Sequence, residues 1–178
     1  MSRSSTSRGL VLRSMAVGGV AVVLAAGPAG AADTPPGAPV PETSPTVSSR
    51  SDLAVSRIDP DAASPGGTTT VRALVWNIGP QRTANPFNVV ITLPPGVTPE
   101  GEVYPDNCAA FQGGHRLRCV FPAGLPAYRT ATARINVRLA ADVPVGTLTG
   151  GWVSVRGLDD KNPDNNKQPF ELPVVAGN

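Results

Sequence analysis

The sequence predicts an all-β chain, an immunoglobulin-like antiparallel β-sandwich of seven to eight strands. Apolar and polar residues alternate with a period of two in successive segments from Asp52 onward. Turn-forming residues separate these segments, in a chain with 19 Gly and 20 Pro among 178 residues. No window shows the 3.6-residue period of an amphipathic helix. Short alternating strands with one polar face are typical of two antiparallel sheets packed together.

The first three strands are each predicted from an alternating run and from the turn that ends it. Residues 53–56 alternate two large apolar side chains with two small ones. In 69–76 the odd positions form an apolar face, and Asn77-Ile78-Gly79-Pro80 ends the strand. Residues 87–93 alternate again and stop at Pro94-Pro95-Gly96. Pro and Gly interrupt a ladder because Pro lacks a donor and Gly favours turns.

The later strands follow the same logic. Gly113-Gly114 predicts a hairpin turn, and Pro144-Val145-Gly146 predicts another turn. A polar run over 159–167 separates the last two strands. The strands predicted in this half are a weak segment within 104–111, then 115–121, 133–139, 152–156 and about 168–175.

Residues 1–31 have the pattern of a secretory signal peptide. A basic region is followed by a small and apolar run over 14–26, and Ala29-Gly30-Ala31 supplies the small residues of a cleavage site. The apolar run is about 13 residues, shorter than the roughly 20 that a membrane-spanning helix needs, so an uncleaved anchor is the weaker alternative. We therefore expect a secreted, extracellular protein with no membrane span in the mature chain.

Removal of the signal peptide changes the charge of the protein. The whole chain has 15 basic and 13 acidic residues, a formal charge of +2. Arg3, Arg8 and Arg13 leave with residues 1–31, so the mature chain has 12 basic and 13 acidic residues, a net charge of −1. A near-neutral chain with 4% aromatic residues does not fit a nucleic-acid-binding domain, and we expect no nucleic-acid partner.

The mature chain divides into a linker and one domain. Residues 32–51 are rich in Pro, Ser and Thr and contain almost no large apolar side chain, which predicts a disordered, semi-extended linker. The sandwich domain is predicted over 52–176. Its length is ample for a single sandwich core.

Two cysteines remain after export, Cys108 and Cys119. An even count at short spacing in an exported chain predicts one disulfide, which would join the two sides of the Gly113-Gly114 hairpin. The alternative is a metal-binding or catalytic thiol pair. A four-ligand zinc site would need further thiols or imidazoles, and the chain has one His.

Six spaced elements between Asp52 and Val175 carry a family resemblance. They are Asp52-Leu53-Ala54-Val55, Pro65-Gly66-Gly67-Thr68, Asn77-Ile78-Gly79-Pro80, Leu93-Pro94-Pro95-Gly96-Val97, the Cys108 and Cys119 pair, and Asp164-Asn165-Asn166. In this order they resemble the bacterial surface-repeat family called domain of unknown function 11. The resemblance implies an immunoglobulin-like sandwich of exported and cell-surface proteins. It implies no reaction.

The sequence offers few residues for catalysis. His115 is the only imidazole, so a Ser-His-Asp or Cys-His mechanism would have to use it. It follows the Gly113-Gly114 turn, where a solvated side chain is the default. The carboxylate pairs Asp159-Asp160 and Glu100/Glu102 lie in turn-like sequence. We therefore predict no catalytic residue, no enzyme activity and no cofactor.

The Asp- and Asn-rich loop within the polar run is a weak calcium candidate. Asp160, Asn162, Asp164 and Glu171 match part of the ligand spacing of a calcium-binding loop. Asn165 replaces the usual Gly, prolines intrude, and strands flank the loop instead of helices. An Asn-rich turn explains the same residues, so we predict no metal site.

Two tryptophans are the candidates for a ligand or partner surface. Strand parity places Trp76 opposite the apolar face, together with Arg72, and places Trp152 likewise with Arg156. An outward ring can stack on a sugar or anchor a protein partner. The alternative is that each ring packs against neighbouring cationic side chains and simply covers its sheet. The sequence does not say whether the two rings are adjacent.

These observations predict a secreted, non-catalytic immunoglobulin-like module with a structural or adhesive role at the bacterial cell surface or in the extracellular space. Its partner would be a protein or glycan at the cell surface. The alternative function is a carbohydrate-binding module that uses the outward-facing tryptophans.

Overall fold

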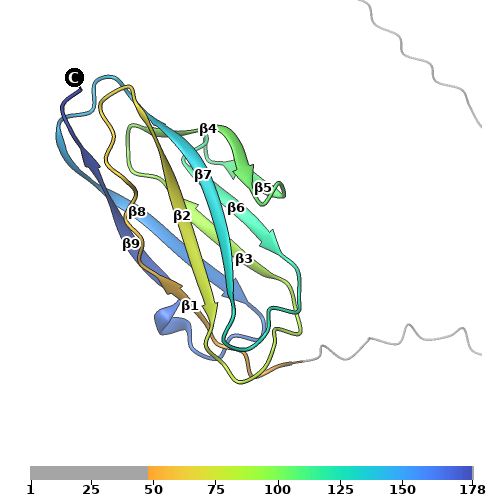
Figure 1. The fold of residues 1–178 in the computed structure, drawn as a ribbon. Coiled ribbons are helices and arrows are strands. Elements are labelled where there is room, and N and C mark those ends of the chain that lie inside the picture. Colours follow the sequence, from red (N-terminus) through yellow and green to blue (C-terminus); the bar gives the residue numbers. More distant parts are fainter. Residues whose placement is uncertain (1–47, 178) are drawn as a thin grey trace, which may run out of the picture. The chain divides into compact units, whose positions relative to one another are not determined.

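The computed structural model describes residues 48–177, which fold into two antiparallel β-sheets (Figure 1). The predicted signal peptide and most of the predicted linker lie outside the described residues. The elements are β1 (Leu53–Ser56), β2 (Thr68–Asn77), β3 (Phe87–Thr92), β4 (Val97–Tyr104), β5 (Cys108–Phe111), β6 (Arg116–Phe121), β7 (Thr130–Leu139), β8 (Gly146–Gly157), the 3₁₀ helix η1 (Pro163–Asn165) and β9 (Lys167–Val174).

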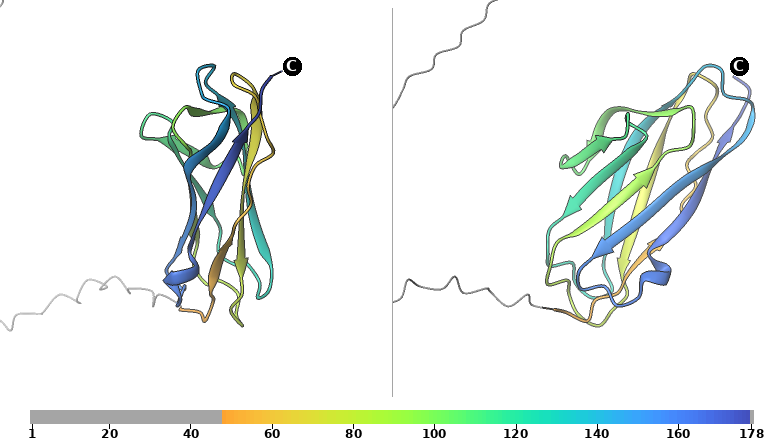
Figure 2. Two further views of the ribbon diagram at one scale, coloured as in Figure 1. Left: turned by 90° about the vertical axis from the view of Figure 1, so that its left-hand side faces the viewer. Right: turned by 180° about the vertical axis from the view of Figure 1, so that it is seen from behind.

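The strands form a four-stranded sheet, β1-β2-β7-β4, and a five-stranded sheet, β5-β6-β3-β8-β9. Every neighbouring pair is antiparallel. The left-hand view of Figure 2 shows the two sheets as layers packed face to face. The predicted immunoglobulin-like β-sandwich is therefore confirmed.

The core lies between the sheets and is built from alternate residues of each strand, as the period of two requires. β2 contributes Val71, Ala73 and Val75, and its partner β7 contributes the odd positions from Ala133 to Leu139, all buried. In the other sheet the Phe87 and Phe121 rings stack with centroids 5.2 Å apart. Burial of the inward face leaves the alternate face of each strand in contact with solvent.

The described residues contain nine strands, one more than the upper predicted number. The additional strand is β4, which the sequence did not predict because Pro99 and Gly101 interrupt its alternation. The register of β4 against β7 shifts between Pro99 and Val103, as expected of a bulge at this interruption. Strand β8 also begins earlier than predicted, at Gly146.

Ordered structure begins before Asp52, the predicted start of the domain. Ser49 and Ser51, in the range predicted as linker, are buried, at 8% and 1% exposure. The Ser49 amide donates to Asp159 Oδ1 (3.4 Å). The side-chain Oδ1 of Asn77 accepts from the amides of Asp52 and Gly79, both at 3.2 Å. Hydrogen bonds to the domain therefore hold a segment whose composition alone predicts disorder.

Candidate functional site

The outer face of the five-stranded sheet carries a groove of about 690 Å³. The right-hand view of Figure 2 faces this sheet. Residues of β3, β6, β8 and β9 line the groove, together with the β5–β6 hairpin, the first residue of η1 and the residue that follows η1. We call it the cationic groove. Its lining residues are Thr92, Gln112, His115, Arg116, Trp152, Ser154, Val155, Arg156, Pro163, Asn166 and Lys167.

Strand register places the outward side chains of this sheet in three cross-strand rows. The first row is Phe111, Arg116, Thr92, Trp152 and Pro169. The second row is Ala109, Arg118, Val90, Ser154 and Lys167. The third row is Val120, Asn88 and Arg156. Directly opposed side chains on one face lie about 4.5–5.5 Å apart at Cβ, so each row is a continuous strip of surface.

The three rows contain four cationic residues and no acidic residue. Arg116, Arg118, Arg156 and Lys167 are the cations, and all but Arg118 line the groove. None of the ion pairs among residues 48–177 involves these four; they join Arg57 to Asp59 and Glu171, and Arg138 to Glu100. The groove therefore presents positive charge that no carboxylate of its own lining neutralises.

Two of these cations lie over aromatic rings of the same face. The Lys167 Nζ lies 4.1 Å from the centroid of the Trp152 ring, and the Arg116 guanidinium carbon lies 5.3 Å from that of Phe111. A cation over an aromatic face is attracted by the ring quadrupole, by about 0.5–1 kcal/mol at an exposed site. The contacts hold each cation over a ring of its own face.

Two polar atoms of the groove lining are buried without a hydrogen-bond partner in the described structure. They are Nε of Arg116 and Oδ1 of Asn166. The Asn166 side chain is held from its other end, because Nδ2 donates to Asp160 Oδ2 (2.6 Å). Buried polar atoms are nearly always paired, so an unpaired donor and acceptor in one groove suit a polar ligand.

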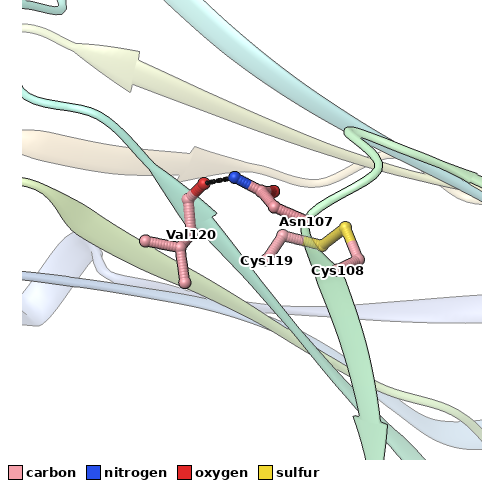
Figure 3. Close-up of a disulfide and its surroundings, with 4 residues drawn as sticks. All are labelled: Asn107, Cys108, Cys119 and Val120. Atoms are coloured by element: carbon pink, nitrogen blue, oxygen red, sulfur yellow. Dashed lines mark hydrogen bonds between the residues drawn. A yellow bond between two sulfur atoms is a disulfide. The ribbon is translucent and has the colours of Figure 1, made fainter.

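A disulfide joins the hairpin that borders the groove, which confirms the predicted pairing of Cys108 and Cys119. The two residues face each other across β5 and β6, with Cα atoms 4.0 Å apart. Figure 3 shows the neighbouring hydrogen bond, from Nδ2 of Asn107 to the carbonyl oxygen of Val120. These links tie together the two strands that carry Phe111 and Arg116.

The structure places the two Trp–Arg pairs, whose adjacency the sequence left open, on different sheets. Trp152 and Arg156 lie on β8 and line the cationic groove. Trp76 and Arg72 lie on β2, in the other sheet, and face outward from it. Both rings are outward-facing as predicted, with 40% exposure for Trp76 and 37% for Trp152. They belong to opposite faces of the sandwich and do not form one patch.

The outer face of the four-stranded sheet carries both basic and acidic side chains, unlike the lining of the cationic groove. Arg72 is opposite Arg134 in register, and the Arg134 guanidinium carbon lies 5.2 Å from the Tyr104 centroid. Glu102 lines the same depression, and Arg138 pairs with Glu100 (2.7 Å). Acidic side chains therefore accompany the arginines on this face.

The residues of the calcium hypothesis do not converge on one point. Oδ1 of Asp160 accepts from the amides of Leu53 and Asn162, and Oδ2 accepts from Asn166. The Asn162 side chain caps η1 by accepting from the amide of Asp164. Glu171 lies on β9 and pairs with Arg57 (3.4 Å). Within residues 48–177 no group of three His, Cys, Asp or Glu side chains could hold a metal.

His115 lines the cationic groove, at the hairpin. No carboxylate lines the groove beside it, and the two thiols of the chain form the disulfide. An imidazole needs an orienting group and a nucleophile within hydrogen-bond reach to work as a catalytic base. The groove supplies neither an Asp–His pair nor a free thiol, and its side chains suit binding.

Sequence reasoning missed Arg116, Arg118, Phe111 and Lys167 as parts of the surface. Parity alone could have placed Arg116 and Arg118 outward, because Leu117 and Cys119 alternate with them. Their meeting with Trp152 and Lys167 depends on the strand order β6-β3-β8-β9. A single sequence does not predict how strands that are far apart in the chain pair with one another.

Comparison with known proteins identifies the fold. No family model matches the sequence, and no curated protein matches it. The third cohesin of ScaC from Acetivibrio cellulolyticus, solved in complex with the ScaB dockerin, is 13% identical with a TM-score of 0.50, over 70% of this chain and 99% of that one. The CARDB domain of PF1109 from Pyrococcus furiosus is 16% identical with a TM-score of 0.46, over 74% and 95%.

A third similar structure is the major pilin subunit BcpA of Bacillus cereus, with 9% identity and a TM-score of 0.48, over 70% of this chain and 40% of the pilin. Of these three, the cohesin reaches a TM-score of 0.50, and at its low identity the likeness shows a shared sandwich fold. In the part of the chain that the structure describes, no helix is long and apolar enough to cross a membrane.

Proposed function

We propose that this chain is a secreted, non-catalytic immunoglobulin-like module that makes adhesive contacts at the bacterial cell surface through the cationic groove. The observation that carries the proposal is the position of Arg116, Arg156 and Lys167 around one groove without a carboxylate in its lining. Unpaired charge of one sign on a single face is a feature of surfaces that recognise a charged partner.

The fold supports this proposal. The cohesin with a similar sandwich is described in complex with a dockerin, so a sandwich of this fold serves as a binding module in that protein. Membership of the domain of unknown function 11 family is part of the same proposal. It is supported by the spaced sequence elements from Asp52-Leu53-Ala54-Val55 to Asp164-Asn165-Asn166.

The carbohydrate-binding alternative is favoured by one further observation. The groove that contains Trp152 also presents hydroxyl and amide side chains, from Thr92, Ser154, Asn166 and Gln112. Such groups hydrogen-bond to sugar hydroxyls. The two functions are compatible if the surface that the module contacts is itself a glycan.

Adhesion is tested by sedimenting the secreted chain with intact cells of the bacterium that secretes it. The variant R116Q/R156Q/K167Q should lose most of its cell-bound fraction while it keeps the melting temperature of the wild type. The matched control R72Q/R134Q, on the other sheet, should bind as the wild type does. Equal retention of both variants, or no retention of the wild type, would overturn the proposal.

Export is tested separately by mass measurement of the protein in the culture medium. Cleavage after Ala31 should give a chain that begins at Ala32. A chain that stays in the cell at its full mass would contradict secretion.

A further inference from the structure

We infer that the cationic groove binds an acidic polysaccharide, a sugar chain whose residues carry carboxylate or sulfate groups. This inference rests on the proposed function, because it names the ligand of the same groove. Three properties of the groove lead to it: the spacing of its charges, the state of its aromatic ring and its polar lining.

The spacing of the cations requires an extended polyanion. Arg116 lies on β6 and Lys167 on β9, which are three strand spacings apart across the sheet. At about 4.8 Å per spacing their backbones are roughly 14 Å apart. The Arg116 head group is held toward β5 by Phe111, and the Lys167 head group is held over Trp152. A single small anion cannot contact both, whereas a chain laid across the strands from β6 to β9 meets a cation at each end.

The aromatic ring of the groove is not an open apolar anchor. Lys167 Nζ occupies one face of the Trp152 ring at 4.1 Å, and the ring is 37% exposed. Protein partners generally bind through a desolvated apolar or aromatic hot spot. The groove presents instead an ammonium held over this ring, which suits a carboxylate or sulfate in hydrogen-bond contact with it.

The lining between the cations suits sugar hydroxyls. Thr92 and Ser154 are outward-facing neighbours of Trp152 in the rows. Asn166 has a buried Oδ1 without a partner, and Arg116 has a buried Nε without one. Protein covers both of these atoms, so the partly exposed hydroxyls of Thr92 and Ser154 are the groups that would meet sugar hydroxyls. A polyhydroxylated anion therefore matches both the charge and the polar lining of the groove.

The test compares two polymers with the same sugar chain and different charge. Binding of the secreted chain to polygalacturonate and to fully methyl-esterified polygalacturonate is measured by titration calorimetry at 0.05 and 0.15 M NaCl. We expect at least about tenfold tighter binding to the acid form, and weaker binding at the higher salt concentration. Dextran sulfate serves as the sulfated probe and separates sulfate from carboxylate recognition.

Single variants assign the binding to the groove. R116Q, R156Q and K167Q should each weaken binding to polygalacturonate about tenfold, because each removes a charged contact. R134Q is the matched control, since it removes an arginine that lies over a tyrosine on the opposite sheet. Thermal melts confirm that each variant is folded. An equal effect of R134Q and R116Q would overturn the assignment.

Other outcomes distinguish this inference from the proposed function. Equal binding to the acid and the ester would show a neutral-glycan site. Polyglutamate or single-stranded DNA bound as tightly as the acidic polysaccharides would show that charge alone is recognised, and would favour an acidic protein or nucleic acid. If neither acidic polysaccharide binds while cells still retain the wild type through these residues, this inference fails and adhesion stands. If neither acidic polysaccharide binds and cells do not retain the wild type, both this inference and the proposed adhesive function fail.

Discussion

The Nζ of Lys167 lies 4.1 Å from the centroid of the Trp152 ring, across the β8–β9 pair. The two residues are diagonal neighbours, because Trp152 is opposite Pro169 and Ser154 is opposite Lys167. The contact joins the one aromatic side chain of the groove lining to one of its cations. It makes Trp152 a support for a charge, which agrees with the alternative from the sequence that the ring packs against a neighbouring cationic side chain and not with an open ring for stacking or anchoring.

The Lys167–Trp152 contact should be visible in fluorescence. The chain has two Trp, so W76F leaves Trp152 as the single indole emitter. Removal of the ammonium in W76F/K167Q should change the emission spectrum and destabilise the domain by about 0.5–1 kcal/mol. W76F/R134Q, changed on the opposite sheet, should keep the W76F spectrum. Identical spectra for all three proteins would contradict a contact in solution.

The disulfide should stabilise the whole sandwich. Cys108 and Cys119 are separated by 11 in sequence, and such a short loop contributes roughly 2–3 kcal/mol to the free energy of unfolding. Replacement by C108A/C119A should lower Tm by roughly 10 °C in a domain of this size. Reductant should lower the Tm of the wild type and leave that of the double variant unchanged. A wild-type Tm that does not respond to reductant would contradict the prediction.

Asp159 should govern stability in acid. The residue is 2% exposed, and its carboxylate accepts hydrogen bonds from the amides of Ala84 (2.7 Å) and Asn85 (2.8 Å) and from Nδ2 of Asn85 (2.6 Å). Burial raises the pKa of Asp159, but these hydrogen bonds, with one from Ser49, outweigh it and hold the pKa below its ordinary value. The stabilisation is therefore present above the unfolded-state pKa of about 3.9 and is lost as pH falls through the folded-state pKa.

The corresponding variant is D159N, in which an amide replaces an acceptor-only carboxylate. It should cost about 2–4 kcal/mol at pH 7 and should flatten the loss of stability between about pH 5 and 3. Urea unfolding across this range measures both effects. D61N, at an exposed position, is the control and should follow the wild-type curve. If D159N lost stability with falling pH as steeply as the wild type, another group would be responsible.

Gly79 should tolerate no side chain. A Cβ at this position would lie 2.6 Å from the Arg50 carbonyl oxygen and 2.6 Å from the Asp52 amide nitrogen. Both are backbone atoms, so the clash can be relieved only by moving the segment that leads into β1. We expect G79A to cost about 2–4 kcal/mol in chemical unfolding. G177A, whose Cβ would meet Ser64 at an ordinary 3.6 Å, should change stability little.

Local sequence patterns predicted much of the fold. The alternation of Val71, Ala73 and Val75 predicts a strand with one buried face, and the structure buries these three. The Gly113-Gly114 turn between two cysteines predicts a cross-linked hairpin, which is present. Strand β4 escaped prediction because Pro99 and Gly101 interrupt its pattern, and pairing with β7 stabilises it in spite of its sequence. Local sequence patterns did not predict the order of the strands in the two sheets.

The candidate site was also predicted in part from the sequence and decided in part by the tertiary structure. The sequence by itself determined which side chains face outward, because the two faces of a strand alternate strictly along the chain. Trp76, Trp152, Arg72 and Arg156 were placed outward in this way. Only the tertiary structure decided which of them meet: β2 and β8 belong to different sheets, so Trp76 and Trp152 are on opposite faces. It also brought Arg116 and Lys167 beside Trp152, because long-range strand pairing, set by packing of the whole core, fixes which distant residues become neighbours.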